Sequence, residues 1–132
     1  MRVVLDASAA ITTVMSRAKA RSFAEHLESA DEVLAPDLFV AEVINTVWKY
    51  HQLENLGLDI CDQWIDSAIH FIDTLVPCEQ VHREAFLLAR TTRRPTYDMF
   101  YLALARREDA AFLTADHALR REAERQGIRV AG

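Results

Sequence analysis

The sequence predicts an α/β fold: a three-layer α/β/α domain in which helices cover both faces of a short central parallel sheet. Short apolar runs alternate with longer amphipathic segments along the 132 residues. The runs are apolar throughout rather than at alternate positions, which is typical of parallel strands buried on both faces. Only three glycines and three prolines interrupt the chain, so we expect closely joined elements in a single domain, residues 1–132.

The first part of the chain contains two of the expected strands. "RVVL" (2–5) and "EVLAP" (32–36) are short apolar runs, and Pro36 ends the second. Periodic apolar positions predict helices over 8–17, 20–29, 37–54 and 59–75, and Gly57 is the stop signal between the last two. The helix over 59–75 is amphipathic, with an apolar stripe that extends to Leu75.

The remainder of the chain continues the alternation. "VHREAFLLARTTR" (81–93) predicts a helix that ends before Pro95, and 96–108 predicts a central, buried helix with Thr96 as its N-cap. "AAFLTAD" (110–116) predicts a further buried strand. A last helix over 117–126 ends at Gly127, and "IRV" (128–130) predicts a final short strand.

Composition limits the compartment and the type of partner. The net charge of −5 argues against a generally basic nucleic-acid binder, but residues 1–79 carry −8 and residues 80–132 carry +3, which permits a phosphate ligand. Two cysteines suggest a reducing compartment and hence the cytoplasm. No run is long and apolar enough for a membrane span, and the N-terminus becomes acidic too early for a secretory signal. A zinc set is conceivable, but its spacing matches no compact ligand pattern: Cys61, His70, Cys78 and His82.

Four acidic residues stand where a parallel sheet places its functional edge. Asp6 closes the first strand and Asp116 closes "AFLTAD"; the carboxyl ends of parallel strands share the edge at which ligands bind. Asp98 lies in the first turn of the helix after Pro95. Glu42 belongs to a narrow polar stripe on an otherwise apolar helix, together with Asn45, Thr46 and Lys49.

Each acid also has an ordinary structural interpretation. Capping and the helix dipole favour aspartate at a helix start, which covers Asp6, Asp98 and Asp116, and Glu42 alone suggests a solvent-facing side chain. Four carboxylates at one edge repel one another, however, and their full ionisation needs a compensating cation. Oxygen ligands select hard ions such as Mg²⁺ or Mn²⁺. Together the four acids favour a metal site over unrelated caps.

The segments that carry the acids resemble one family. "VVLDASAA" (3–10), "FVAEVINTVWK" (39–49), "TYDMFYLALA" (96–105) and "FLTADHAL" (112–119) together resemble the PIN-domain ribonucleases, most of all the VapC-type toxins of bacterial toxin–antitoxin pairs. The resemblance runs from Arg2 to about Val130, and none of the four acids departs from the family pattern. It implies a PIN-like fold with one or two divalent ions, Mg²⁺ or Mn²⁺, held by Asp6, Glu42, Asp98 and Asp116.

The resemblance further implies a metal-dependent endoribonuclease that hydrolyses RNA phosphodiester bonds. The four acids are then the catalytic residues. Asp6 and Asp98 are expected to bind metal directly, and Asp116 completes the ligand set directly or through water. Glu42 orients the attacking water or binds a second ion.

Further residues are expected around the acids. Ser8, Asn45 and Thr114 position carboxylates and waters, or else serve as caps and strand-end hydrogen-bond partners; both interpretations stay open. Helical spacing favours core packing of Tyr97 and Tyr101 over stacking on a base. The candidates for contact with RNA, each with a solvent-facing role as its alternative, are Lys49, Arg93, Arg94 and His117.

The resemblance also implies partners. These are an RNA substrate of the tRNA or rRNA class, a cognate antitoxin that lays an amphipathic segment into an apolar groove, and a second copy of the chain as a homodimer. Two other functions are weighed. A non-catalytic RNA- or protein-binding module on the same fold need not keep all four acids. A phospho-acceptor domain lacks support, because Ser8 stands where a D-x-D motif has its second aspartate and the chain has no glycine-rich phosphate loop.

Overall fold

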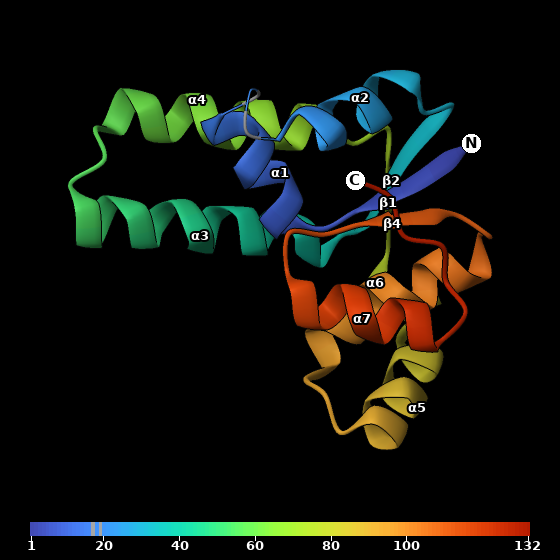
Figure 1. Cartoon of the computed structure of the whole chain (residues 1–132). Coiled ribbons are helices and arrows are strands. Elements are labelled where there is room, and N and C mark those ends of the chain that lie inside the picture. Colours follow the sequence, from blue (N-terminus) through green and yellow to red (C-terminus); the bar gives the residue numbers. More distant parts are fainter. Residues whose placement is uncertain (17, 19) are drawn as a thin grey trace.

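The computed structural model describes residues 1–16, 18 and 20–132, and Figure 1 shows the course of the chain. The strands are β1 (Arg2–Leu5), β2 (Glu32–Pro36), β3 (Thr74–Val76) and β4 (Ala111–Leu113). The helices are α1 (Ala7–Met15), α2 (Arg21–Ser29), α3 (Leu38–Glu54), α4 (Leu58–His70), α5 (His82–Thr92), α6 (Thr96–Arg107) and α7 (His117–Arg125), with a short 3₁₀ turn over Cys78–Gln80. None of the described helices is both long and apolar enough to span a membrane.

The four strands form one parallel sheet in the order β3-β2-β1-β4. Val4 of β1 lies opposite Leu34 of β2 on one side and Phe112 of β4 on the other. The chain adds β2 and β3 on one side of β1 and then returns to add β4 on the opposite side. The topological switch point, where such sheets bind ligands, therefore lies between β1 and β4.

The sheet is the middle of three layers, as predicted. Figure 1 shows α5, α6 and α7 on one side of the sheet and α1, α2, α3 and α4 on the other, with α3 and α4 forming a long antiparallel pair. Burial on both faces explains why β1 and β4 are apolar at every inner position.

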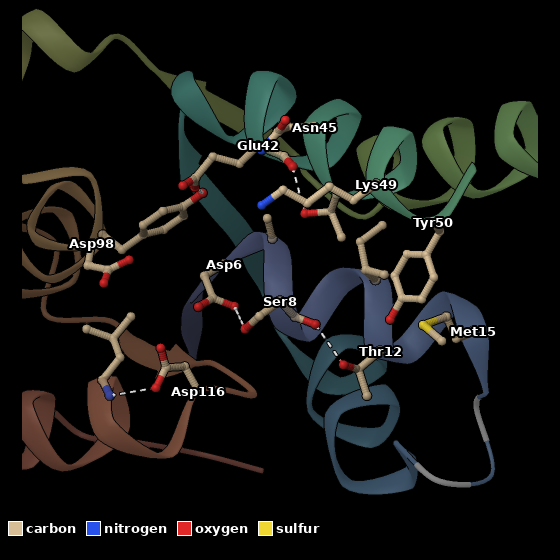
Figure 2. A pocket seen from close by; sticks show the side chains of 15 residues that line it. Asp6, Ser8, Thr12, Met15, Glu42, Asn45, Lys49, Tyr50, Asp98 and Asp116 are labelled. Carbon is tan, nitrogen blue, oxygen red and sulfur yellow. Dashed lines mark hydrogen bonds between the residues drawn. The ribbon is translucent and has the colours of Figure 1, made fainter. Parts of the chain in front are cut away.

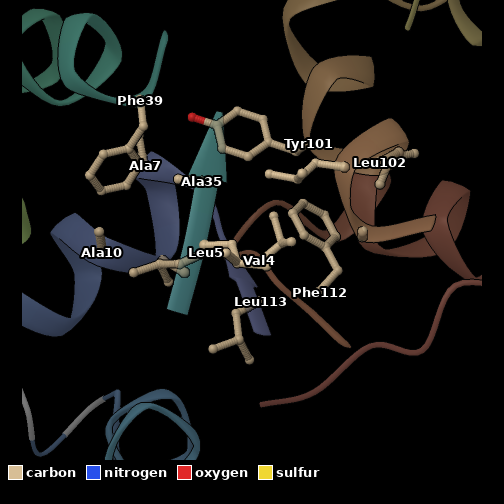
Figure 3. Packing of buried hydrophobic residues seen from close by; sticks show 14 of the residues in the cluster. Val4, Leu5, Ala7, Ala10, Ala35, Phe39, Tyr101, Leu102, Phe112 and Leu113 are labelled. Atoms are coloured by element: carbon tan, nitrogen blue, oxygen red, sulfur yellow. The ribbon is translucent and has the colours of Figure 1, made fainter. Parts of the chain in front are cut away.

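The core joins the sheet to the central helix α6. Figure 3 shows Phe112 of β4 beside Tyr101 and Leu102 of α6, and all three are buried. The rings of Tyr101 and Phe112 are 6.3 Å apart between centroids. The prediction that the apolar middle of the 96–108 segment is central and buried is confirmed. This packing fixes the start of α6 relative to the ends of β1 and β4.

One helix prediction and one strand prediction need correction. The helix predicted over 59–75 ends at His70, and residues 74–76 form β3 instead. The apolar periodicity continues past His70, and no glycine or proline follows to end the predicted helix. Two hydrogen bonds instead join Asp73 to Val33 of β2. The backbone N–H of Asp73 donates to the Val33 carbonyl, and the Asp73 carboxylate accepts from the Val33 N–H, both at 2.8 Å. The last predicted strand, 128–130, is reduced to one bridge between Val130 and Phe112.

Other differences concern the ends of elements. The strand predicted over 110–116 stops at Leu113, because side-chain oxygens of Ser8 and Thr114 take over the N–H groups of residues 115 and 116. Thr96 is not the N-cap of α6; it is the first helical residue, and Pro95 occupies the cap position without a side-chain bond. The helix predicted over 8–17 ends at Met15, and residue 17 lies outside the described residues.

Candidate active site

A pocket of about 400 Å³ opens at the carboxyl ends of β1 and β4 (Figure 2). All four acids predicted from the sequence line it: Asp6, Glu42, Asp98 and Asp116. They come from four separate segments of the chain, so the fold rather than sequence proximity brings them together. In Figure 2 the carboxylates of Asp6, Asp98 and Asp116 face a common space, and Glu42 enters from α3.

Asp6 is the buried member of the group, with 5% of the residue exposed. Its Oδ1 accepts hydrogen bonds from Ser8 Oγ at 2.7 Å and Ala9 N at 2.9 Å, and its Oδ2 accepts one from the Thr114 hydroxyl. The bond from Ala9 caps α1, so the capping interpretation of Asp6 is confirmed alongside its place in the pocket. No other described residue donates to Oδ2, which leaves one of its lone pairs available to a further ligand.

Glu42 is not the solvent-facing side chain that its sequence position alone predicts. It is half-buried, and the hydroxyl of Tyr101 donates a hydrogen bond to its Oε1 at 2.5 Å. Tyr101 is itself a core residue, as predicted, whereas Tyr97 is 65% exposed and its predicted core packing is wrong. Three positions separate Asp98 from Tyr101, so both project from the same side of α6 toward the pocket.

Asp98 and Asp116 stand at the starts of α6 and α7. Oδ1 of Asp116 accepts hydrogen bonds from Ala118 N at 2.9 Å and Leu119 N at 3.1 Å, which makes Asp116 the N-cap of α7. The half-buried carboxylate of Asp98 makes no hydrogen bond with any described residue. The positive ends of both helix dipoles favour the anionic form of these two groups.

The electrostatics of the pocket disfavour full ionisation of its acids. Burial raises the pKa of Asp6 to about 6, three hydrogen bonds oppose this effect, and the charge of Glu42 adds to it. Burial also raises the pKa of Glu42, and the charge of Asp98 raises it further. Burial raises the pKa of Asp98 in the same way, and the charge of Asp116 adds to that rise. The Arg94 charge partly offsets the rise at Asp98.

This donor set fits a hard divalent cation. All four candidate ligands are carboxylates, and Asp6, Asp98 and Asp116 retain oxygen lone pairs that no described residue uses. As they stand, the described side chains contain no group of three or more His, Cys, Asp or Glu close enough to hold a metal ion. Mutual repulsion keeps ionised carboxylates apart, and a cation among them removes that repulsion.

The predicted polar stripe of α3 faces the pocket as a unit: Glu42, Asn45, Thr46 and Lys49 all line it. In Figure 2 the Lys49 side chain extends back toward the acidic end of the pocket. The structure places Ser8 and Thr114 directly on Asp6, whereas Asn45 lines the pocket without a hydrogen bond to another described residue. The other candidates for contact with RNA lie outside the pocket lining: Arg93, Arg94 and His117.

Sequence reasoning missed several pocket residues. Tyr101 was expected only as a core residue, although its position three residues after Asp98 signals a shared helix face. Thr12, Met15 and Tyr50 form the end of the pocket away from the acids (Figure 2). Tyr50 packs edge-on against Trp64, with ring centroids 5.7 Å apart.

The cysteines are separate thiols. Cys61 is buried in α4, and Cys78 lies in the 3₁₀ turn; neither forms a disulfide. The conceivable zinc set of Cys61, His70, Cys78 and His82 is not assembled, since no such group of ligands is present among the described residues.

Comparison with known proteins agrees with the fold and identifies the family. The PIN domain family matches residues 3–124. The chain is 28% identical over 121 residues to Ribonuclease VapC3 of Pyrobaculum aerophilum, an alignment that covers 90% of this chain and 92% of that protein.

Solved structures share the fold. VapBC2 from Rickettsia felis, bound to a DNA fragment from its promoter, matches with a TM-score of 0.67 and 12% identity over 98% of this chain and 97% of that one. VapC20 of Mycobacterium tuberculosis, a sarcin-ricin loop cleaving toxin, matches with a TM-score of 0.63 and 13% identity over 91% and 94% of the two chains. With the family match spanning nearly all of its length, the chain belongs to the PIN-domain family.

Proposed function

We propose that this chain is an endoribonuclease that hydrolyses RNA phosphodiester bonds with Mg²⁺ or Mn²⁺, and that it is the toxin of a toxin–antitoxin pair. The observation that carries the proposal is the pocket in which Asp6, Glu42, Asp98 and Asp116 meet at the switch point of the sheet. The similarity to Ribonuclease VapC3 and to a sarcin-ricin loop cleaving toxin supports it.

The surroundings of each acid indicate its role at a bound metal ion. When bound, a divalent ion supplies positive charge at the scissile phosphate and activates water near neutral pH. Asp6 and Asp98 would hold the ion directly. Asp116 would hold it directly or through water, using the oxygen that does not cap α7.

Hydrogen bonds hold the acids in place for this task. The hydroxyls of Ser8 and Thr114 fix the orientation of the Asp6 carboxylate, which is the role of positioning residues around a metal ligand. Tyr101 fixes Glu42 in the same way, so that Oε2 of Glu42, to which no described residue donates, can orient a water or bind a second ion. Lys49 supplies a positive charge to the pocket and would bind a phosphate of the RNA.

The proposal extends to partners and context. Residues 1–132 would act as one PIN domain in the cytoplasm, with a tRNA or rRNA as substrate. A cognate antitoxin protein would inhibit the chain, which would also form a homodimer, alone or within a hetero-oligomer with the antitoxin. The structure of VapBC2 from Rickettsia felis supports the expectation of a partner protein.

Induction in a bacterium tests the proposal. The wild-type chain, Asp6→Ala and the exposed control Asp62→Ala are each induced while growth is followed and new RNA 5′ ends are sequenced. The proposal predicts arrest and discrete cuts with the wild type and with Asp62→Ala, and neither with Asp6→Ala. Cuts that persist in Asp6→Ala contradict it. A folded wild-type chain that binds RNA but cuts none, in cells and in vitro with Mn²⁺, supports the non-catalytic binding module instead.

A further inference from the structure

Glu122 is a buried carboxylate to which the proposed reaction gives no role. Only 5% of the residue is exposed, yet it accepts hydrogen bonds from Arg94 Nε and Gln126 Nε2, both at 3.2 Å, and Arg125 Nη1 lies 3.8 Å away. Burial raises the pKa of this carboxyl, but the bonds from Gln126 and Arg94 and the two arginine charges bring it below the usual value. Glu122 is therefore a buried, ionised carboxylate of α7 that binds Arg94.

Arg94 lies between Glu122 and the segment that carries Asp98. It lies between α5 and α6, four residues before Asp98, and its charge acts on the Asp98 carboxylate. Glu122 engages only the Nε of the guanidinium. Within the described part of the chain, the two terminal nitrogens of Arg94 donate no hydrogen bond. An arginine held through Nε keeps those nitrogens as a fork that matches the oxygens of a phosphate.

We propose that Glu122 is a positioning residue that holds Arg94 in the segment leading into α6, four residues before Asp98, where the terminal nitrogens of Arg94 bind a phosphate group of the RNA. The inference rests on the proposed function and deepens it by naming a phosphate-binding group. A polyanion approaching four carboxylates needs such cations, and Lys49 is the one basic side chain that lines the pocket among the described residues. Arg94, in the segment between α5 and α6 and outside the pocket lining, adds a second cation.

A purely structural ion pair makes the opposite prediction for one variant. Glu122→Gln keeps the shape and can still accept from Nε, but it removes a negative charge. If Glu122 only ties α7 to the segment before α6, loss of that charge makes the region more positive and strengthens RNA binding. If Glu122 positions Arg94, the weaker hold on the guanidinium lowers RNA affinity despite the more favourable net charge.

Binding of a labelled single-stranded RNA is measured by fluorescence anisotropy in EDTA, which prevents hydrolysis, over a range of salt concentrations. KM and kcat are then measured with Mn²⁺. The variants are Arg94→Ala, Glu122→Gln and the pair combined. The matched control is Arg125→Ala, which removes the other cation near Glu122, and thermal unfolding shows that each variant is folded.

We expect Arg94→Ala to weaken binding about tenfold and to reduce the magnitude of the salt slope by about 0.7, the value of one phosphate contact on a single strand. Glu122→Gln weakens binding about threefold, and the combined variant binds no more weakly than Arg94→Ala alone. KM rises in parallel while kcat changes less than about twofold, and Arg125→Ala, which only makes the region less positive, weakens binding less than about twofold.

Unchanged or tighter binding by a folded Glu122→Gln, or an unchanged salt slope in Arg94→Ala, overturns the inference while the ribonuclease proposal stands. A wild-type chain that neither binds nor cleaves RNA overturns both.

Discussion

Asp6→Asn is predicted to inactivate the chain and, at neutral pH without divalent ions, to stabilise it. The carboxylate is buried, and its pKa rises from 3.8 to about 6, so ionised Asp6 costs the folded state about 3 kcal/mol at neutral pH. Asparagine has nearly the same shape and no charge. Its oxygen can still accept from Ala9 and Ser8, and its amide can donate to Thr114.

The sign of the pH dependence follows from a pKa that is higher in the folded chain than in the unfolded one. The stability contributed by protonated Asp6 is fully present below pH 3.8 and is lost as the pH rises through about 6. The stability advantage of Asp6→Asn over the wild type should therefore grow by about 3 kcal/mol over this window. For a chain of this length, the Tm of Asp6→Asn minus the Tm of the wild type should therefore increase by on the order of 10 °C over the same pH window.

Thermal unfolding in EDTA at a series of pH values is the assay, with Asp62→Asn on the exposed face of α4 as the control. Adding Mn²⁺ at neutral pH should raise the Tm of the wild type and of the control but not of Asp6→Asn, because only an intact ligand set binds the ion. A Tm difference that does not change with pH, or an advantage of the wild type that grows as the pH rises, would refute the reasoning.

Two other substitutions test neighbouring parts of the account. Tyr101→Phe removes the hydrogen bond to Glu42 and should lower RNA cleavage about tenfold at a cost of about 1 kcal/mol in stability, measured by single-turnover kinetics and urea unfolding, while the exposed Tyr97→Phe changes neither. Phe112→Ala leaves a cavity beneath α6 and should cost about 3–5 kcal/mol in urea unfolding; a loss below 1 kcal/mol would contradict the described core.

The sequence was sufficient to predict that Asp6 and Asp116 converge, because their proximity follows from topology. Asp6 and Asp116 each follow an apolar strand, and parallel strands end at one edge, so their proximity needs no knowledge of side-chain packing. The polar stripe that contains Glu42 could also be predicted from the sequence, since helical spacing determines which residues share a face. Both patterns depend only on local periodicity and on the class of sheet.

Features that depend on packing between elements were not predictable in this way. The bond from Tyr101 to Glu42 joins two helices whose distance and crossing no local pattern encodes. The ion pair between Arg94 and Glu122 spans 28 positions, and neither residue belongs to a recognisable motif. β3 escaped prediction because three residues are too few for a strand period to show, and the preceding helical period continues through Leu75.

The central claim is that the four carboxylates hold a divalent ion that cleaves RNA, and the measurement closest to it is cleavage by the purified chain. Wild type, Asp98→Asn and the exposed control Asp59→Asn are incubated with RNA in EDTA, Mg²⁺ or Mn²⁺, and their folding is checked by circular dichroism. The account predicts metal-dependent cleavage by the wild type and by Asp59→Asn, and none by a folded Asp98→Asn. Equal cleavage by Asp98→Asn, or cleavage that is unaffected by EDTA, would contradict it.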